Sequence, residues 1–228
     1  TQFMFLKLKS RIKYLRDSLY SIILPGKESI RVEDVLTILT RDLKHPVVYS
    51  GGVGKNITFE LELINRFDAT IYAFDPTETG IKTINALPTS NRLHFYQVAL
   101  SDIDGILELN LPVNIQEGSY TKGVFKGDQN FKTGFPCRKI SSLMNELGHS
   151  KLDILKIDIE GSEYEVINNV LDEKIEFDQL CVEFHHFFKS IPRKATSDIL
   201  KRLKMEGYQL FHKRELDFSF CKVKNLKP

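Results

Sequence analysis

The sequence predicts an α/β fold with a mostly parallel, doubly wound sheet that ends in an antiparallel pair of strands at its C-terminal edge. Short runs of β-branched and aromatic residues alternate with amphipathic helical repeats, which is typical of such sheets. The chain then closes with two strand-like runs in YQLFHKRELDFSFCKV. Its 228 residues are 42% hydrophobic, which suits one domain with one sizeable core.

Residues 1–40 are predicted to form N-terminal helices, and 41–228 the domain proper. In FLKLKSRIKYLRDSLYSIILPG, apolar residues recur at helical spacing between lysines and arginines, and Pro25-Gly26 ends the run. This basic amphipathic helix either packs on the domain or docks on an anionic membrane or a partner domain. A second helix is expected around Ser29–Thr40.

The domain shows five buried strands separated by helices and loops. The strands are HPVVYSGG, ATIYAFDP, LHFYQVALSD, KLDILKID and FDQLCVEFH. Between the third and fourth, GILELNLPV alternates in polarity and is expected to be antiparallel. A loop from about Gln116 to Gly134 follows, and its aromatic and hydroxyl residues suit a substrate platform. These residues include Ser119, Tyr120 and Thr121, beside Glu117 and Lys122.

Charge and cysteine content narrow the class of protein. The 32 basic and 30 acidic residues are too evenly balanced to indicate a nucleic-acid partner. No apolar run approaches the ~20 residues of a transmembrane helix. Three widely separated cysteines without a CxxC motif predict a reduced, cytoplasmic location.

Two features at neighbouring strand ends predict a site for an adenosine-containing cofactor. Ligands of doubly wound sheets bind beyond the carboxyl ends of the strands. There YSGGVGKN carries Gly51, Gly52 and Val53, where glycine lets the backbone approach a ligand. Asp75 ends the next strand about 20 residues later, where a carboxylate accepts hydrogen bonds from both ribose hydroxyls. Alternatively, Asp75 or Thr77 caps the following helix.

The cofactor is either NAD or S-adenosylmethionine, and the sequence favours the second. NAD needs a pyrophosphate site, and the GxGxxG motif that usually forms it is absent. Ser50, the glycine carbonyls and Asn56 suit the amino-acid tail of S-adenosylmethionine. Pro76 redirects the chain after the second strand. At the end of the third, Ser101 and Asp102 could read the adenine amino group, or Asp102 could be a turn residue.

Five segments resemble the FkbM-type S-adenosylmethionine-dependent methyltransferases in order and spacing. They are VVYSGGVGKNITFELELI, IYAFDPT, FYQVALSDIDG, CRKISSLMNELGHSKLDILKIDIEGSEYEVI and LCVEFHH. The likeness runs from about Val47 to the C-terminus, and LDILKIDIEGSEYEVI is its most specific element. It implies a Rossmann-like, seven-stranded methyltransferase domain. This chain departs from many relatives in having Ser50 or its neighbours where they carry an acid.

The resemblance implies methyl transfer to a hydroxyl, often on a sugar, a glycan or a glycosylated natural product. Two alternatives stay open. One is a non-catalytic adenosyl-binding or interaction domain of a larger glycan-assembly protein, with an upstream or partner glycosyltransferase domain. The other is an NAD-linked oxidoreductase, which the absent pyrophosphate motif disfavours.

An alcohol that accepts a methyl group must lose its proton, and three residues at two strand ends are candidates for that chemistry. They are Asp158, Glu160 and His185. A divalent metal held by these three is allowed by ligand type but not supported by spacing, so no metal site is predicted. Glu183 is expected to be buried, either at the site or paired with Lys156.

The remaining polar residues of DIEGSEYE are expected to start a helix. Ser162 and Glu165 fit the S-x-x-E capping box, in which each side chain bonds the other's backbone amide. Glu163 lies in the first turn, where negative charge suits the helix dipole.

Overall fold

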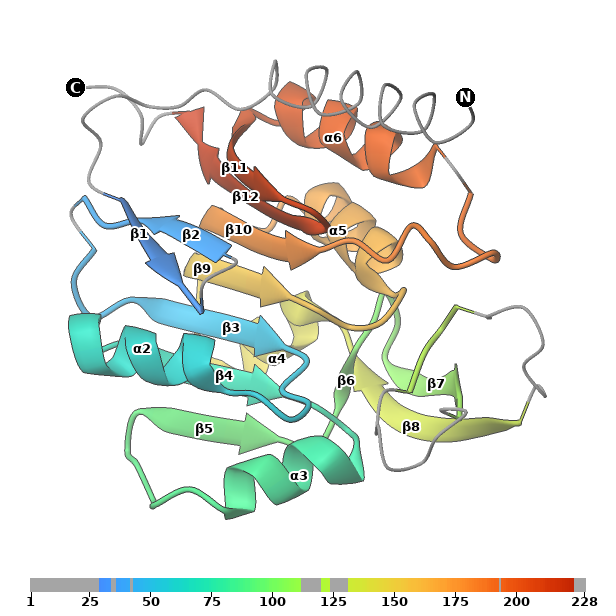
Figure 1. The fold of residues 1–228 in the computed structure, drawn as a ribbon, viewed down its shortest axis with the longest axis horizontal. Helices are drawn as coiled ribbons and strands as arrows, with labels where there is room; N and C mark the ends of the chain where they lie inside the picture. The colour runs from blue at the N-terminus through green and yellow to red at the C-terminus, as the bar shows by residue number, and fades with distance from the viewer. Residues whose placement is uncertain are drawn as a thin grey trace, which may run out of the picture.

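A computed structural model of the chain describes residues 29–33, 36–41, 43–111, 120–123, 131–192 and 194–223. The predicted basic helix, Glu117 and Ser119 lie outside this part of the chain. The described residues form a seven-stranded sheet with helices on both faces, a three-stranded sheet beside it, and a two-stranded hairpin (Figure 1).

The seven-stranded sheet has the order β11-β12-β10-β9-β3-β4-β5. The five strands from β10 to β5 are parallel, whereas β12 runs antiparallel to both β10 and β11. The predicted doubly wound sheet with an antiparallel C-terminal edge pair is therefore confirmed. Its strands are β3 (Val47–Gly51), β4 (Thr70–Phe74), β5 (Leu93–Tyr96), β9 (Leu152–Ile157), β10 (Phe177–Glu183), β11 (Tyr208–Arg214) and β12 (Asp217–Lys222).

Strand order reverses between β3 and β9, and this places the ligand edge. The chain runs outward from β3 through β4 to β5, then returns to β9 on the other side of β3. In open α/β sheets, the crevice at such a switch point lies beyond the carboxyl ends of the strands. The glycine turn after β3 and Asp158 after β9 meet at this point.

Alternate residues of the buried strands face two separate apolar cores. Tyr49 and Leu155 pack into a core with α4 (Ile140–Leu147), α5 (Glu163–Asp172) and α6 (Ala195–Met205). Their neighbours Val48 and Ile154 pack into a second core with α2 (Thr58–Phe67) and α3 (Glu78–Asn85). Helices therefore cover both faces, as the sequence predicted (Figure 1).

The helix expected around Ser29–Thr40 is wrong, because this segment is a β-hairpin. Strands β1 (Ser29–Val32) and β2 (Leu36–Leu39) pair antiparallel. The turn between them includes Glu33 at φ 53, a left-handed conformation that a helix does not contain. Figure 1 shows the hairpin lying across the face of the large sheet that α2 also covers.

Tertiary hydrogen bonds fix the hairpin in place. The amide of Thr37 donates to Ser219 Oγ at 3.2 Å. The carboxamide of Gln179 accepts from the amide of Leu39 at 2.7 Å and donates to the Leu39 carbonyl at 2.9 Å. Both partners lie on strands far away in the sequence, so a local helical pattern could not reveal them.

The third predicted strand, LHFYQVALSD, is two strands in different sheets. After β5, the amide of Val98 bonds the carbonyl of Tyr96 at 2.9 Å in a tight turn. The chain then enters β6 (Ala99–Leu100), which belongs to the sheet β6-β8-β7 with β7 (Gly105–Asn110) and β8 (Lys132–Arg138). Strand β7 is antiparallel as expected, while β8 and α4 were not predicted. Ser101 therefore follows a strand of the small sheet.

The three cysteines Cys137, Cys181 and Cys221 are free thiols, and all are buried. Across the described part of the chain, every helix is too short or too polar to cross a bilayer.

We expect Gln179→Leu to destabilise the domain, because it leaves the buried amide and carbonyl of Leu39 without their partners. Each unsatisfied group costs ~1–3 kcal/mol. For a domain of this size the melting temperature should fall by about 2–4 °C per kcal/mol. Thermal unfolding followed by circular dichroism measures this. The same change at half-buried Gln209 on edge strand β11 is the control. An equal effect of both variants would contradict the anchoring role of Gln179.

Candidate functional site

A cavity of about 290 Å³ opens at the switch point of the large sheet. Such a volume is at the lower end of the range for small-molecule sites. Its walls come from five places in the chain: the glycine turn after β3, the end of β4, the loop after β9, the small sheet, and the β1–β2 turn. The small sheet contributes Leu100, Leu107, Leu109 and nearby Tyr120, which are apolar or aromatic.

The glycine turn lies directly against the end of β9. A Cβ atom added to Gly52 would sit 1.7 Å from the carbonyl oxygen of Asp158, and the residue has φ +85. The amide of Asp158 donates to the carbonyl of Gly51 at 3.0 Å. Only glycine fits this approach and this backbone conformation. The turn and Asp158 are therefore held side by side at the cavity wall.

Asp75 shapes this turn with both of its carboxylate oxygens. Oδ2 accepts from the amides of Val53 and Gly54 at 3.0 and 2.8 Å. Oδ1 accepts from the amide and the hydroxyl of Thr77 at 2.8 and 2.7 Å. These four bonds use the usual capacity of a carboxylate. Thr77 is the N-cap of α3, since its hydroxyl accepts from the amide of Gly80 at 3.1 Å.

The structure brings seven of the eleven predicted cofactor-binding residues to the cavity wall. Among the described residues, Ser50 and Gly51 lie behind the turn, and Ser101 with Asp102 lies at the end of β6. The Ser50 hydroxyl is fully buried and donates to the Glu60 carboxylate instead. The seven residues on the wall are Gly52, Val53, Asn56, Asp75, Pro76, Thr77 and Asp158.

Lys156 is a buried cation at the base of this site. Its ammonium donates to the carbonyl of Gly52 at 2.6 Å and lies 3.9 Å from Asp158. Burial opposes this charge, yet the carboxylates of Glu60, Asp158, Glu33 and Asp75 outweigh it and raise the pKa of Lys156. The expected pairing of Lys156 with Glu183 is wrong, because the ammonium of Lys156 bonds the glycine turn instead.

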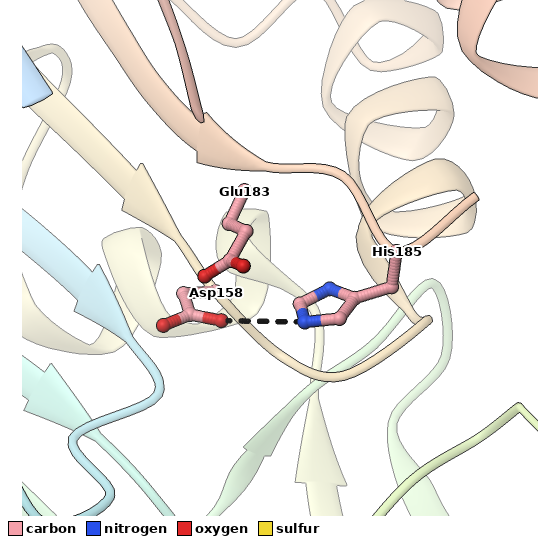
Figure 2. Close-up of side chains that lie close together, drawn as sticks. All are labelled: Asp158, Glu183 and His185. Carbon is pink, nitrogen blue, oxygen red and sulfur yellow. Dashed lines mark ion pairs between the residues drawn. The ribbon is translucent and has the colours of Figure 1, made fainter. Parts of the chain in front are cut away.

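A second charged cluster joins the loop after β9 to the end of β10. The Nε2 atom of His185 lies 3.4 Å from Glu160 and 3.9 Å from Asp158. Figure 2 shows the carboxylate of Glu183 beside that of Asp158, with the ring of His185 directed at Asp158. Of these groups, Asp158 and Glu160 line the cavity itself. The three predicted catalytic residues therefore lie close together.

His185 is oriented by Glu163, a residue that sequence analysis assigned to the helix alone. The ring Nδ1–H donates to the fully buried carboxylate of Glu163 at 2.7 Å, so Nε2 faces Asp158 and Glu160. Burial opposes a charge on His185, but the bond to Glu163 and the nearby Glu160 and Asp158 raise its pKa to about 9. His185 is therefore an imidazolium at neutral pH. The sequence shows Glu163 directly after Gly161-Ser162, but its partner His185 lies 22 residues further along the chain, so sequence analysis could not link the two.

The predicted capping box of α5 is wrong. Ser162 is the N-cap residue, but its side chain makes no capping bond, and Glu165 instead pairs with Lys122 at 2.8 Å. Glu163 takes over the start of the helix by accepting from the amide of Gly161 at 3.0 Å. This leaves the Ser162 hydroxyl without a hydrogen bond among the described residues, although it is buried at the cavity wall. A ligand or an ordered water in the cavity can satisfy this hydroxyl.

The acids beside His185 hold protons more strongly than usual. Burial, followed by repulsion from Asp158, raises the pKa of Glu183 to about 7. Burial and the same neighbour raise the pKa of Asp217 to about 6. Asp217 is the partner of Glu183 across the β10–β12 ladder. This end of the sheet can therefore exchange protons near neutral pH.

Asp158, Glu183 and His185 also form a set of metal-ligand types, with one atom of each lying within 4.8 Å of the others. Carboxylate and imidazole ligands suit several divalent ions. Without a metal, protonated His185 supplies the positive charge next to these carboxylates. The cluster therefore has the groups both for proton chemistry and for holding a divalent ion.

The strand order and the cavity at its switch point define the architecture of Rossmann-like methyltransferases. The model of a protein family described as "Methyltransferase FkbM domain" matches residues 44–210. The chain belongs to the FkbM methyltransferase family.

Curated relatives include "Probable methyltransferase-like protein 24" of Homo sapiens and of Rattus norvegicus. Each is 32% identical over 176 residues, which cover 72% of this chain and 42% of the relative. The match therefore spans less than half the length of these relatives. Similar solved structures include monomeric WbdD, with 14% identity and a TM-score of 0.45 over 80% of this chain and 38% of that one. A methyltransferase from Pyrococcus furiosus has 13% identity and a TM-score of 0.40 over 95% of this chain and 98% of that one.

We expect Gly80→Ala to disturb the glycine turn through Asp75. An added Cβ would lie 2.4 Å from Asp75 Cγ, and overpacking of this kind costs ~1–3 kcal/mol. The melting temperature should fall, although alanine is the better helix former by ~1 kcal/mol at an open site. Lys82→Ala, at an exposed position of the same helix, is the control and should change little. A stabilised Gly80→Ala variant would show that the added Cβ is accommodated without disturbing Asp75.

Proposed function

We propose that this domain is an S-adenosylmethionine-dependent O-methyltransferase that methylates a hydroxyl of a sugar, a glycan or a glycosylated metabolite. The observation that carries the proposal is the carboxylate–imidazolium cluster at the wall of a cavity formed by the glycine turn. The cluster offers proton acceptors where an acceptor hydroxyl would meet the cofactor.

The cavity fits the proposed cofactor in its chemistry. S-adenosylmethionine supplies a methyl group that is already activated on a sulfonium. Its charged tail suits the polar part of the cavity near Lys156, and its aromatic base suits the apolar wall near Leu107 and Tyr120. The open backbone of Gly54, where an added Cβ would meet nothing within 4 Å, leaves room beside the turn. The orphan hydroxyl of Ser162 is a further group that a ligand can satisfy.

We assign removal of the hydroxyl proton to the pair formed by Asp158 and Glu183. Asp158 faces the cavity, and Glu183 has a pKa of about 7, so together they accept a proton at neutral pH. A base matched to the working pH contributes ~10²–10⁴-fold.

His185 and Glu160 support this pair. Because Glu163 fixes the ring, the Nε2–H of protonated His185 points at the two cavity carboxylates and stabilises them as anions. Glu160 holds a left-handed backbone at φ 53, and its carbonyl accepts from the amide of Lys122 at 2.9 Å. Glu160 thus links the described part of the long loop, including Tyr120 on the cavity wall, to the site.

Support for a hydroxyl acceptor comes from the cluster, and support for a glycan comes from the family resemblance. Amines and thiols need less help from a base than an alcohol, whose proton is far less acidic. The non-catalytic adenosyl-binding domain and the NAD-linked oxidoreductase remain the rival functions.

The cofactor is tested by thermal shift with S-adenosylhomocysteine and with NAD. Ligand at ~100 times its Kd adds ~2.7 kcal/mol, which should raise the melting temperature by roughly 5–10 °C. We expect this with S-adenosylhomocysteine and no shift with NAD. A shift with NAD alone would refute the proposal.

Catalysis is tested with methyl-labelled S-adenosylmethionine and a panel of glycosides, with amines and thiols for comparison. Mass spectrometry should find the label on an oxygen. Asp158→Asn should lose at least ~10²-fold in rate because it removes a proton acceptor. Asp198→Asn on the surface of α6 is the matched control and should keep full activity. Cofactor binding without transfer to any acceptor would favour the non-catalytic rival.

The pH profile tests the proton assignments. The charged groups facing Glu183 are Asp158, His185, Asp217 and Glu160. Since the raised pKa leaves Glu183 protonated in acid, kcat/KM should rise about tenfold per pH unit below about 7 and then level off. It should fall again above about 9 as His185 loses its proton.

Two variants separate these groups. Glu183→Gln should lose the acid limb of the profile, whereas Asp217→Asn should keep the limb and shift it to lower pH. The second effect follows because Asp217 repels the ionised form of Glu183. An acid limb that persists unchanged in Glu183→Gln would refute the role of Glu183.

A further inference from the structure

Glu33 reaches the cavity from outside the part of the chain that matches the family. It lies on the turn after β1, before the matched residues 44–210, and is one of the residues that line the cavity. The hairpin that carries Glu33 packs on the same face of the sheet as Ile154 and Cys181. Lys156, two residues after Ile154 on β9, points to this face as well. The family motifs therefore do not account for this acid.

Glu33 is half-buried and has two hydrogen-bond partners. Its carboxylate accepts from the side-chain amide of Asn56, and its own amide donates to Glu62 at 3.4 Å. Its backbone is left-handed at φ 53, a conformation that non-glycine residues rarely adopt and that persists where the surroundings enforce it. A carboxylate accepts about four hydrogen bonds, so the bond from Asn56 leaves capacity for a ligand.

The charges around Glu33 favour a cationic ligand. Four carboxylates, of Glu33, Glu60, Asp75 and Asp158, raise the pKa of Lys156, and Lys55 is the other lysine on the cavity wall. Burial raises the pKa of Glu33, and Glu60 and Asp158 raise it further against the opposing effect of Lys156. An added positive charge would lower the free energy of these acids.

The other acids of this group already have partners. Glu60 accepts from the hydroxyl of Ser50 behind the turn, and Asp75 accepts four hydrogen bonds. Asp158 belongs to the proton pair with Glu183. Ser50 itself is fully buried away from the cavity, so this position of the first motif supplies no acid there for a cationic group.

We propose that Glu33 binds the α-ammonium group of the methionine tail of S-adenosylmethionine, so that the β1–β2 hairpin completes the cofactor site. Glu33 thereby supplies the acid for the ammonium group that the first motif, which has Ser50, lacks. This inference rests on the proposed function, because it concerns the same cofactor.

The test compares two ligands by isothermal titration calorimetry. S-adenosylhomocysteine carries the amino-acid tail, whereas 5′-methylthioadenosine has the same nucleoside and no tail. Glu33→Gln keeps the size and hydrogen-bonding shape of the side chain but removes its charge. It should weaken S-adenosylhomocysteine about 10- to 100-fold, as expected for loss of a hydrogen bond to a charged group, and leave 5′-methylthioadenosine unchanged.

Glu206→Gln, at an exposed position after α6, should bind both ligands like the wild type. Unchanged S-adenosylhomocysteine affinity in Glu33→Gln would overturn the inference, and so would equal weakening of both ligands, because Glu33 would then act on cavity shape. Failure of the wild type to bind either ligand would instead refute the proposed function itself.

Discussion

The site depends on the interactions of one buried cation, the ammonium of Lys156. It lies in the middle of the large sheet, bonds the carbonyl of Gly52 and balances the acids around the cavity. A buried cation is stable only when it is paired and hydrogen-bonded. Here the groups that pair with Lys156 come from the glycine turn, the end of β4, the end of β9 and the hairpin, so one charge interacts with all four segments. The same charge lets Asp158 stay close to Glu33 and Asp75 without a prohibitive repulsion.

Excess negative charge divides the site into two regions with different chemistry. Near Lys156 the acids Glu33, Asp75 and Asp158 line the cavity together with the lysines Lys55 and Lys156, so negative charge is in excess and favours a cationic group of a ligand. Around His185, the imidazolium offsets Asp158 and Glu160, while burial keeps Glu183 protonated until about neutral pH. Asp158 lies between the two regions. Asp158 therefore separates a region that favours a cationic group from a region that exchanges protons near neutral pH.

Much of the fold was predictable because it is encoded locally. Strand runs such as KLDILKID have the continuous apolar character of strands buried on both faces, and β9 forms where expected. The hairpin was not predictable, because its helical spacing is overridden by Ser219 and Gln179 on distant strands. The division of LHFYQVALSD between two sheets was also hidden, since a tight turn at Val98 leaves the apolar pattern unbroken.

The sequence by itself determined that the glycine turn, Asp75 and Asp158 follow strands whose carboxyl ends share one edge of a sheet. Tertiary structure alone decided what each residue does there. Lys156 meets Gly52 across 104 positions of the chain, and Glu33 arrives on a hairpin packed against the opposite end of the sequence. Glu163 turned from a helix-start residue into the group that orients His185. The reason is physical: strand ends follow from local periodicity, whereas charge pairing depends on which distant backbones pack together.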